Sequence, residues 1–182
     1  MSKNGLTISL NEVLFYFTRA GFGVNASIGV SEDFARSNIW IAQNGFDPSE
    51  CSLLALDNLD SQTSSLSIQF EKTGDGSHLF CPEDKVLSAI EASVSCVDWL
   101  EFNGLDGDLK LTNVDSPLLV VSALGANQCT GIQVSWTDKS NNHYEVNLKD
   151  DIEWEIISSS EAPIELSNYA DIHISALDVN NK

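Results

Sequence analysis

The spacing of apolar residues changes once along this chain, near residue 60, and that change limits the fold more than any other feature. Before it, apolar residues recur every three or four positions, the spacing that buries one side of a helix. After it, they alternate with polar residues over short stretches, which is typical of strands with one buried face. The sequence therefore predicts a helical first third followed by a mixed region of strands and helices.

Capping signals divide the first third into three helices. In Ser9–Glu12, the Ser9 hydroxyl and the Glu12 carboxylate can each accept from the other residue's backbone amide, which forms a capping box. Glycine just past a helix is a common stop signal. The helices expected here run from Leu10 to Gly21 or Gly23, from Asn25 or Ser27 to Gly45, and from Cys51 to about Asn58 after an Asp47-Pro48 cap.

The rest of the chain is expected to form a sheet with two helices inserted between its strands. A strand–helix alternation in the middle favours helices packed on one face of a sheet. The expected strands are 66–70, 85–91, 109–114, 132–136, 144–148, 152–157 and 172–177; the expected helices begin at Ser93 or Ser95 and, after an Asp115-Ser116-Pro117 cap, at Leu118. Residues 86–100 could instead form one long helix, but the serines and the β-branched Val94 and Val97 favour the strand followed by a helix.

These elements predict an α+β fold in one domain, residues 1–182. Its N-terminal three-helix layer, residues 1–59, is expected to pack on a mixed, mainly antiparallel sheet with two inserted helices, residues 66–178.

The charge of the chain excludes several functions. With 27 acidic and 9 basic side chains, the net charge is −18. A nucleic-acid-binding protein or one that docks on anionic lipid needs a basic face. No stretch approaches the roughly 18 apolar residues of a membrane span, and the N-terminus does not spell a signal peptide. We therefore expect a cytoplasmic protein with no nucleic-acid or membrane partner.

Few motifs in the chain carry chemistry. Gly21–Ala26 matches the G-x-G-x-x-A spelling of dinucleotide-binding loops, but a helix and not a strand is expected before it, so no cofactor is predicted. The four cysteines form no C-x-x-C pair and are expected to be reduced. His78 and Cys81 lie three residues apart, which supplies too few ligands for zinc, so no metal is predicted. A thiol needs only one base, however, so His78 and Cys81, with Arg36 as an anion partner, are the residues to test for catalysis.

Several short segments resemble an uncharacterised bacterial family, a domain of unknown function. The similarity lies in the helix that begins Ser9-Leu10-Asn11-Glu12, in Cys81-Pro82 and in Pro117-Leu118-Leu119, with a strand ending at Trp136 farther along. The resemblance implies a single bacterial cytosolic domain. It implies no activity, because the family has none to transfer.

Three functions remain open on the sequence. The first is a non-catalytic accessory or interaction protein of metabolism that self-associates or binds a protein partner, because the chain is strongly acidic and shows no catalytic cluster. The second is a small-molecule binding module with its pocket between the helical layer and the sheet. The third is a small enzyme whose site combines His78, Cys81 and Arg36. An exposed apolar patch would favour the first, a pocket the second, and a cleft of titratable groups the third.

Overall fold

The computed structural model describes residues 8–74, 76–83, 85–139, 141–149, 154–158 and 169–177. Its helices are α1 (Leu10–Gly23), α2 (Ile28–Gln43), α3 (Pro48–Asp60), α4 (Ala89–Asn103) and α5 (Pro117–Ala126). Its strands are β1 (Ser64–Ser65), β2 (Gln69–Thr73), β3 (Gly76–Phe80), β4 (Val86–Leu87), β5 (Asp108–Val114), β6 (Ile132–Thr137), β7 (His143–Leu148), β8 (Trp154–Ser158) and β9 (Ala170–Ala176). The α+β class, with N-terminal helices and a mixed sheet, is confirmed.

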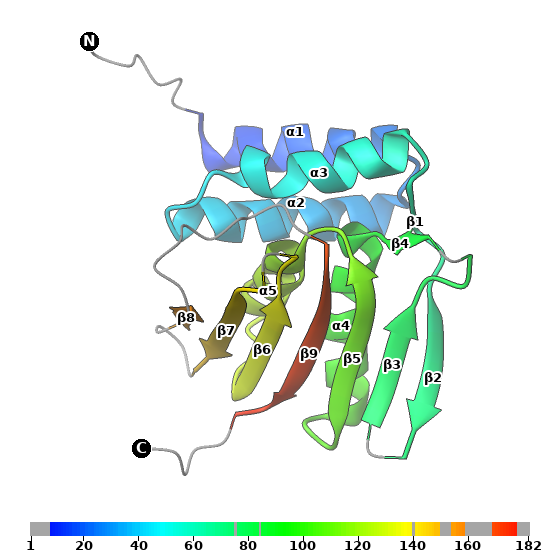
Figure 1. The fold of residues 1–182 in the computed structure, drawn as a ribbon. Coiled ribbons are helices and arrows are strands. Elements are labelled where there is room, and N and C mark those ends of the chain that lie inside the picture. Colours follow the sequence, from blue (N-terminus) through cyan, green and yellow to red (C-terminus); the bar gives the residue numbers. More distant parts are fainter. Residues whose placement is uncertain are drawn as a thin grey trace.

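The strands form one sheet in the order β1-β4-β5-β9-β6-β7-β8, and the β2–β3 hairpin joins it along β5. β3 and β4 run parallel to β5, whereas β9 runs antiparallel to both β5 and β6. The C-terminal strand thus lies in the middle of the sheet, between two strands that come much earlier in the chain (Figure 1). This insertion brings residues about 60 positions apart into direct contact.

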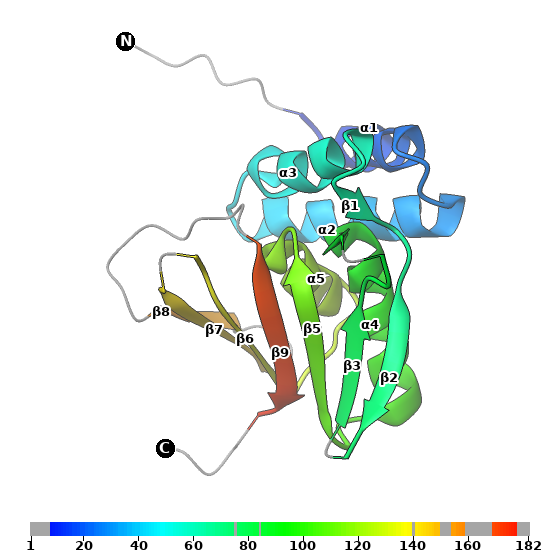
Figure 2. The ribbon, with the colours of Figure 1, turned by 45° about the vertical axis from the view of Figure 1, so that its right-hand side comes forward.

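The helices leave one face of the sheet open. α4 and α5 lie together behind the sheet, and α1, α2 and α3 form a layer across their ends (Figures 1 and 2). α2 packs on α5 and α4, and α1 packs on α2, so the N-terminal layer meets the sheet mainly through the inserted helices. No described helix covers the other face of β3, β5, β9 and β6 (Figure 2).

Alternation along the strands separates a buried face from this open face. Leu109 and Leu111 of β5 and Ile172 and Ile174 of β9 are at most 2% exposed, while the residues between them are polar. The apolar α5 lies between α2, α4 and the sheet and is buried along most of its length. A side chain at Gly125 would collide with the Trp40 indole, so the close approach of α5 to α2 requires glycine there.

The N-terminal part of the fold agrees closely with the sequence prediction. The Ser9–Glu12 capping box is present at the start of α1, Ser27 caps α2, and Asp47 caps α3 with Pro48 in the first turn. The first two helices match their expected lengths, and α3 begins at Pro48, directly after its expected cap, and continues to Asp60, past the expected end near Asn58.

Three boundaries in the middle of the chain were predicted wrongly. The strand expected over 85–91 is only Val86–Leu87, because residues 89–91 belong to α4. The helix expected from Ser93 or Ser95 begins at Ala89, because Ser88 accepts from the Ile90 amide and Asp115 accepts from the Ala89 amide at 2.8 Å. The strand expected over 66–70 begins only at Gln69, so residues 66–68 are not part of a strand. At the start of α4 a contact from 26 residues away overrides the local preference of the serines and β-branched residues.

The expected cap before α5 is also wrong in its contacts. Pro117 does begin α5, but Ser116 makes no side-chain cap and instead donates to the Cys51 carbonyl at 2.8 Å. Asp115 caps α4 rather than α5. These two polar side chains therefore connect α5 to α3 and α4.

Asp115 is an ionisable group in the interior, with no exposed surface. Burial raises the pKa of its carboxyl to about 6, although the Ala89 amide, Ser64 and Asn58 favour the ionised form. Within the described residues, Asp115 Oδ2, Ser64 Oγ and Asn58 Nδ2 make no hydrogen bond of normal geometry. Burial therefore favours the protonated, neutral form of the Asp115 carboxyl over the ionised form, at this junction of α3, β1, α4 and β5.

None of the helices in the described part of the chain is long and apolar enough to span a membrane.

Candidate functional site

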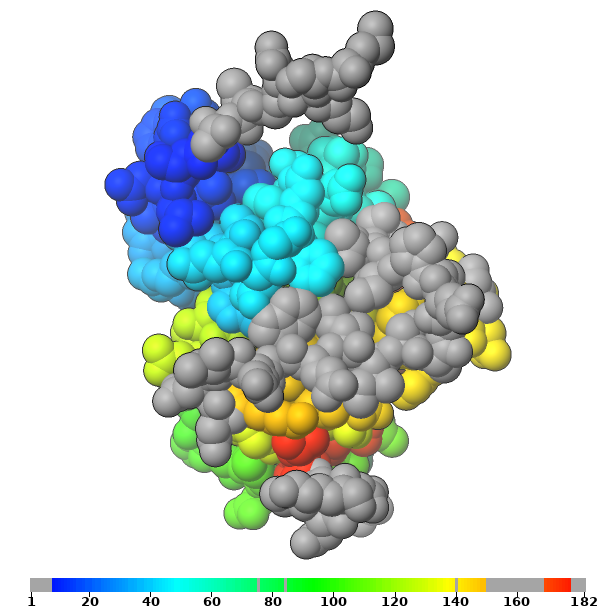
Figure 3. Space-filling view, turned by 90° about the vertical axis from the view of Figure 1, so that its left-hand side faces the viewer, coloured from blue at the N-terminus to red at the C-terminus, as the bar shows by residue number. Residues whose placement is uncertain are grey.

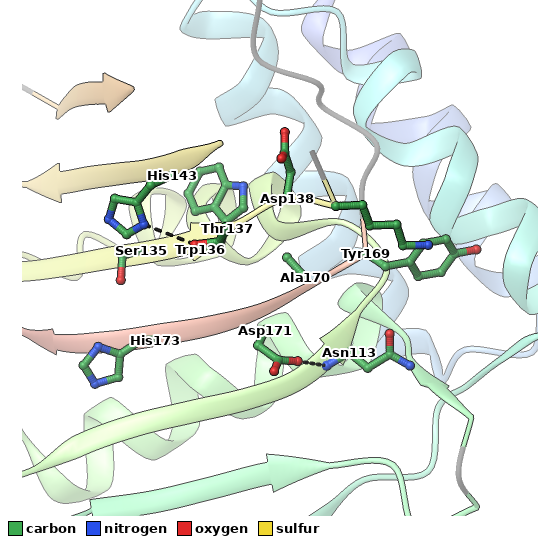
Figure 4. A pocket seen from close by; sticks show the side chains of 11 residues that line it. Asn113, Ser135, Trp136, Thr137, Asp138, His143, Tyr169, Ala170, Asp171 and His173 are labelled. Carbon is green, nitrogen blue, oxygen red and sulfur yellow. Dashed lines mark hydrogen bonds between the residues drawn. The ribbon is translucent and has the colours of Figure 1, made fainter. Parts of the chain in front are cut away.

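The open face of the sheet carries a shallow polar groove made of two adjoining hollows, of about 730 and 410 Å³. Both hollows are bounded by Asp171 and His173 of β9, so they adjoin along this strand. The larger lies over β3, β5 and β9, and the smaller over β9 and the ends of β5 and β6 (Figure 4). We take this groove as the candidate site.

A row of three nitrogen-bearing side chains crosses the larger hollow. The strand register places Lys110 of β5 directly beside His78 of β3 on one side and His173 of β9 on the other. All three belong to the open face, because their strand neighbours Leu79, Leu109 and Ile174 are buried. We call these residues the His78–Lys110–His173 row.

The two imidazoles of the row are held by hydrogen bonds. His78 Nε2 lies 2.8 Å from Thr112 Oγ1, and the His78 ring also stacks on Phe80. His173 Nε2 lies 3.0 Å from Asp108 Oδ2. Each ring is thereby fixed in orientation, with its Nδ1 not engaged in these bonds.

Lys110 differs from its neighbours because no described carboxylate lies within ion-pair distance of its ammonium group. The two nearby acids already have partners: Asp108 pairs with His173, and Asp171 accepts from the Asn113 amide at 2.8 Å. Among the described residues Lys110 therefore has no ion-pair partner, although Asp108 and Asp171 line the same hollow.

The smaller hollow adds hydroxyl, imidazole and charged side chains, Asp138 and Lys139 among them, and a residue with positive φ. Thr137 Oγ1 lies 3.3 Å from His143 Nδ1, and the Lys139 ammonium lies over the Tyr169 ring (Figure 4). Asn113 has a positive φ of 53°, at an irregularity in the β5–β9 pairing. Asparagine tolerates this conformation better than most residues, and such strain is often found at functional sites.

The groove thus contains His78, His143 and His173, all three histidines of the chain. Sequence reasoning regarded His143 and His173 as residues of distant segments and missed this grouping. The alternation of side chains along each strand was available as a signal: each histidine is next to a buried residue of its own strand, so it points to the opposite face. This alternation shows that a residue faces away from the core, but it does not show which strands are neighbours in the sheet.

The groove does not form a metal centre. Among the described residues, no group of three or more histidine, cysteine or acidic side chains has the geometry to hold a metal ion. The physical reason is spacing: His78 and His173 lie two strands apart, a separation of about 10 Å between backbones, whereas ligands of zinc lie about 2 Å from the ion.

The structure does not bring the three residues proposed for catalysis together. His78 lies in the groove. Cys81, three residues farther along the chain, packs in the hydrophobic core and is only 8% exposed. Cys81 lies just after the end of β3 and before Pro82. Arg36 lies on α2, where it pairs with Asp33 and Glu32 of the same helix.

Three of the four thiols are poorly suited to nucleophilic chemistry. Burial, aided by Asp47 and Glu50, raises the pKa of Cys51 to about 12. Burial also raises the pKa values of Cys96 and Cys129. A reactive cysteine needs a lowered pKa, which none of these three thiols has.

The Gly21–Ala26 motif lies where the sequence analysis placed it, at a turn between two helices. Gly21 and Gly23 form the end of α1, and the chain enters α2 after Ser27. Gly21 packs against Ser31 of α2, so the space that glycine provides is used for helix packing.

No protein-family model and no curated protein matches the sequence. The fold is similar to solved structures of malate dehydrogenase from Pyrococcus horikoshii (TM-score 0.60, 11% identity, covering 90% of this chain and 53% of that one). Malate dehydrogenase from Entamoeba histolytica has a TM-score of 0.55 at 8% identity, with 87% of this chain and 50% of that one covered. Sulfolactate dehydrogenase from Methanocaldococcus jannaschii has a TM-score of 0.55 at 9% identity, with 87% of this chain and 52% of that one covered. This chain therefore spans about half the length of these enzymes, and the likeness is one of fold.

Proposed function

We propose that this protein binds a small hydroxycarboxylate anion in the groove on the open face of the sheet. The observation that carries the proposal is the Lys110 ammonium, which lies between His78 and His173 and has no ion-pair partner in the part of the chain that the structure describes. A lysine is a compact positive charge with three donors. The Nδ1 of His78 can donate as well when its Nε2 accepts from the Thr112 hydroxyl, whereas His173 already donates through Nε2 to Asp108 and adds a second donor only as an imidazolium.

The hydroxyl of such a ligand also has suitable partners. Thr112 and Asp108 lie on the same strand as Lys110, at alternate positions on the same face, and line the same hollow. A carboxylate held at Lys110 would place a neighbouring hydroxyl within reach of these side chains. The structural neighbours support this ligand class, because malate and sulfolactate are small hydroxy-acid anions.

This proposal develops the second of the three functions left open by the sequence, but at a different place. The pocket was expected between the helical layer and the sheet, whereas the groove lies on the sheet face that no described helix covers. We propose binding alone, because at 8–11% identity the likeness to these enzymes is one of fold.

Replacing Lys110 with methionine should weaken malate binding at least about tenfold, because the charge is lost while the length of the side chain is kept. Isothermal titration calorimetry of the wild type and Lys110→Met with malate measures the change. Lys72→Met is the matched control, since Lys72 lies on the adjacent hairpin outside the groove.

Succinate and inorganic phosphate identify the ligand class. Succinate lacks the hydroxyl of malate and should bind about fivefold more weakly, the effect of one hydrogen bond. Equal binding of malate to the wild type and to Lys110→Met would contradict the proposal. So would tighter binding of phosphate than of malate.

A further inference from the structure

The outer surface of α1 is apolar to an unusual extent for an exposed helix. Phe15, Tyr16 and Phe22 expose 54%, 57% and 59% of their surfaces, and Leu10 and Leu14 expose 44% and 37%. Only Val13 and Gly21 of this helix are buried. We call these five exposed residues the α1 patch.

The patch has a continuous centre. Phe15 and Phe22 are seven residues apart, so they lie on the same side of the helix two turns apart. Tyr16 contacts the Phe15 ring edge-on, and the Arg19 guanidinium lies 5.0 Å above that ring. Aromatic and arginine side chains of this kind are enriched at the centres of protein interfaces.

The Arg19 guanidinium lies over the Phe15 ring at the surface of the helix. An arginine in this position can stack with a second aromatic ring from another molecule, because the other face of its planar group remains available.

The charge on α1 indicates what covers the patch. The chain has a net charge of −18, but α1 contains one acid, Glu12, and one base, Arg19, and so has no net charge. Two copies of the chain would repel each other through most of their surfaces, and α1 is a neutral apolar surface on which they can meet.

The size of the patch is consistent with the centre of an interface between two copies. Its three aromatic side chains, each of about 150–250 Å² and more than half exposed, contribute on the order of 300 Å² of apolar surface. The leucines add to this, and a standard interface of about 800 Å² per partner is completed by a polar rim.

We propose that the protein forms a symmetric homodimer through the α1 patch. In such a dimer α1 of one copy packs against α1 of the other, so that Phe15 and Phe22 of each copy are covered by the same residues of its partner. α1 lies on the side of α2 away from α4 and α5, so the groove on the sheet remains open in the dimer (Figures 1 and 2). The space-filling view places this N-terminal helix, in blue, at the surface of the molecule (Figure 3).

The test is the concentration dependence of mass, measured by analytical ultracentrifugation from about 1 to about 100 µM. The wild type should be dimeric at the upper end. The double variant Phe15→Gln/Phe22→Gln should raise the dimer dissociation constant at least about 30-fold, as expected when central aromatic residues are removed.

Two controls make the result specific. Phe102→Gln changes the most exposed phenylalanine, which is 89% exposed in the last turn of α4, and should leave the dimer unchanged. Added salt should tighten the dimer, because it screens the repulsion between two acidic chains.

A monomeric wild type at about 100 µM would overturn the proposal and would assign the patch to a different partner. Equal effects of Phe102→Gln and the double variant would also overturn it. Substitutions of exposed side chains are expected to change stability little. Circular dichroism of each variant checks that it is folded. The outcome does not depend on whether the groove binds an anion.

Discussion

Replacing Asp115 with asparagine should remove a large part of the pH dependence of this protein's stability. The native carboxyl has a pKa of about 6, raised by burial from its ordinary value of 3.8. Because the folded state holds the proton more tightly than the unfolded chain, stability is greatest when Asp115 is protonated. It falls as the pH rises from about 4 to about 6, by about 3 kcal/mol in total.

The effect is measured as a difference between two proteins. Urea unfolding of the wild type and of Asp115→Asn, at several values between about pH 4.5 and pH 7.5, should show the wild type losing about 2 kcal/mol relative to the variant. The pKa of Glu91 is also raised, by burial and by Asp98, but this residue is present in both proteins and its effect cancels. Parallel profiles for the two proteins would show that Asp115 is ionised in the native state throughout.

Replacing Gly76 with alanine should destabilise the protein by about 3 kcal/mol or more. Gly76 is the residue of β3 paired with Asp108 of β5, and a Cβ built on it would overlap the Asp108 backbone. Backbone atoms in a sheet cannot move aside without breaking the pairing, so the strain cannot be relieved by a change of rotamer.

Gly74 in the same hairpin is the control for this prediction. A Cβ at Gly74 meets nothing within 4 Å, so Gly74→Ala should change the free energy of unfolding by no more than about 0.5 kcal/mol. Denaturant titrations of both variants give the comparison. If Gly76→Ala were as stable as Gly74→Ala, the close pairing of β3 with β5, and with it the position of His78 beside Lys110, would be incorrect.

The parts of the fold that were predictable from the sequence are those fixed by neighbouring residues. The Ser9–Glu12 capping box, the Ser27 cap and the Asp47-Pro48 start are all local signals, and each marks a helix in the structure. The alternation in β5, β6 and β9 was likewise visible, because side chains of a strand alternate between two faces whatever its partner is.

Elements that depend on distant contacts were not predictable. The start of α4 is set by Asp115, which lies 26 residues later and whose side chain was expected to cap α5. Burial of α4 against the rest of the protein then stabilises the helix, although its sequence has only a modest helix propensity.

The candidate site depends on the same kind of information. His78 was recognised as a residue of interest, but its proposed partners, Cys81 and Arg36, lie in the core and on α2. Lys110 and His173 become neighbours only because β9 inserts between β5 and β6. A single sequence does not specify which strand pairs with which.

The most direct test of the groove as a binding site is side-chain nuclear magnetic resonance of the three histidines during a malate titration. We expect the imidazole signals of His78 and His173 to shift together and to saturate in the wild type, and to stay unchanged in Lys110→Met. Malate binding that leaves both signals in place would contradict the account, because the ligand would then lie outside the His78–Lys110–His173 row.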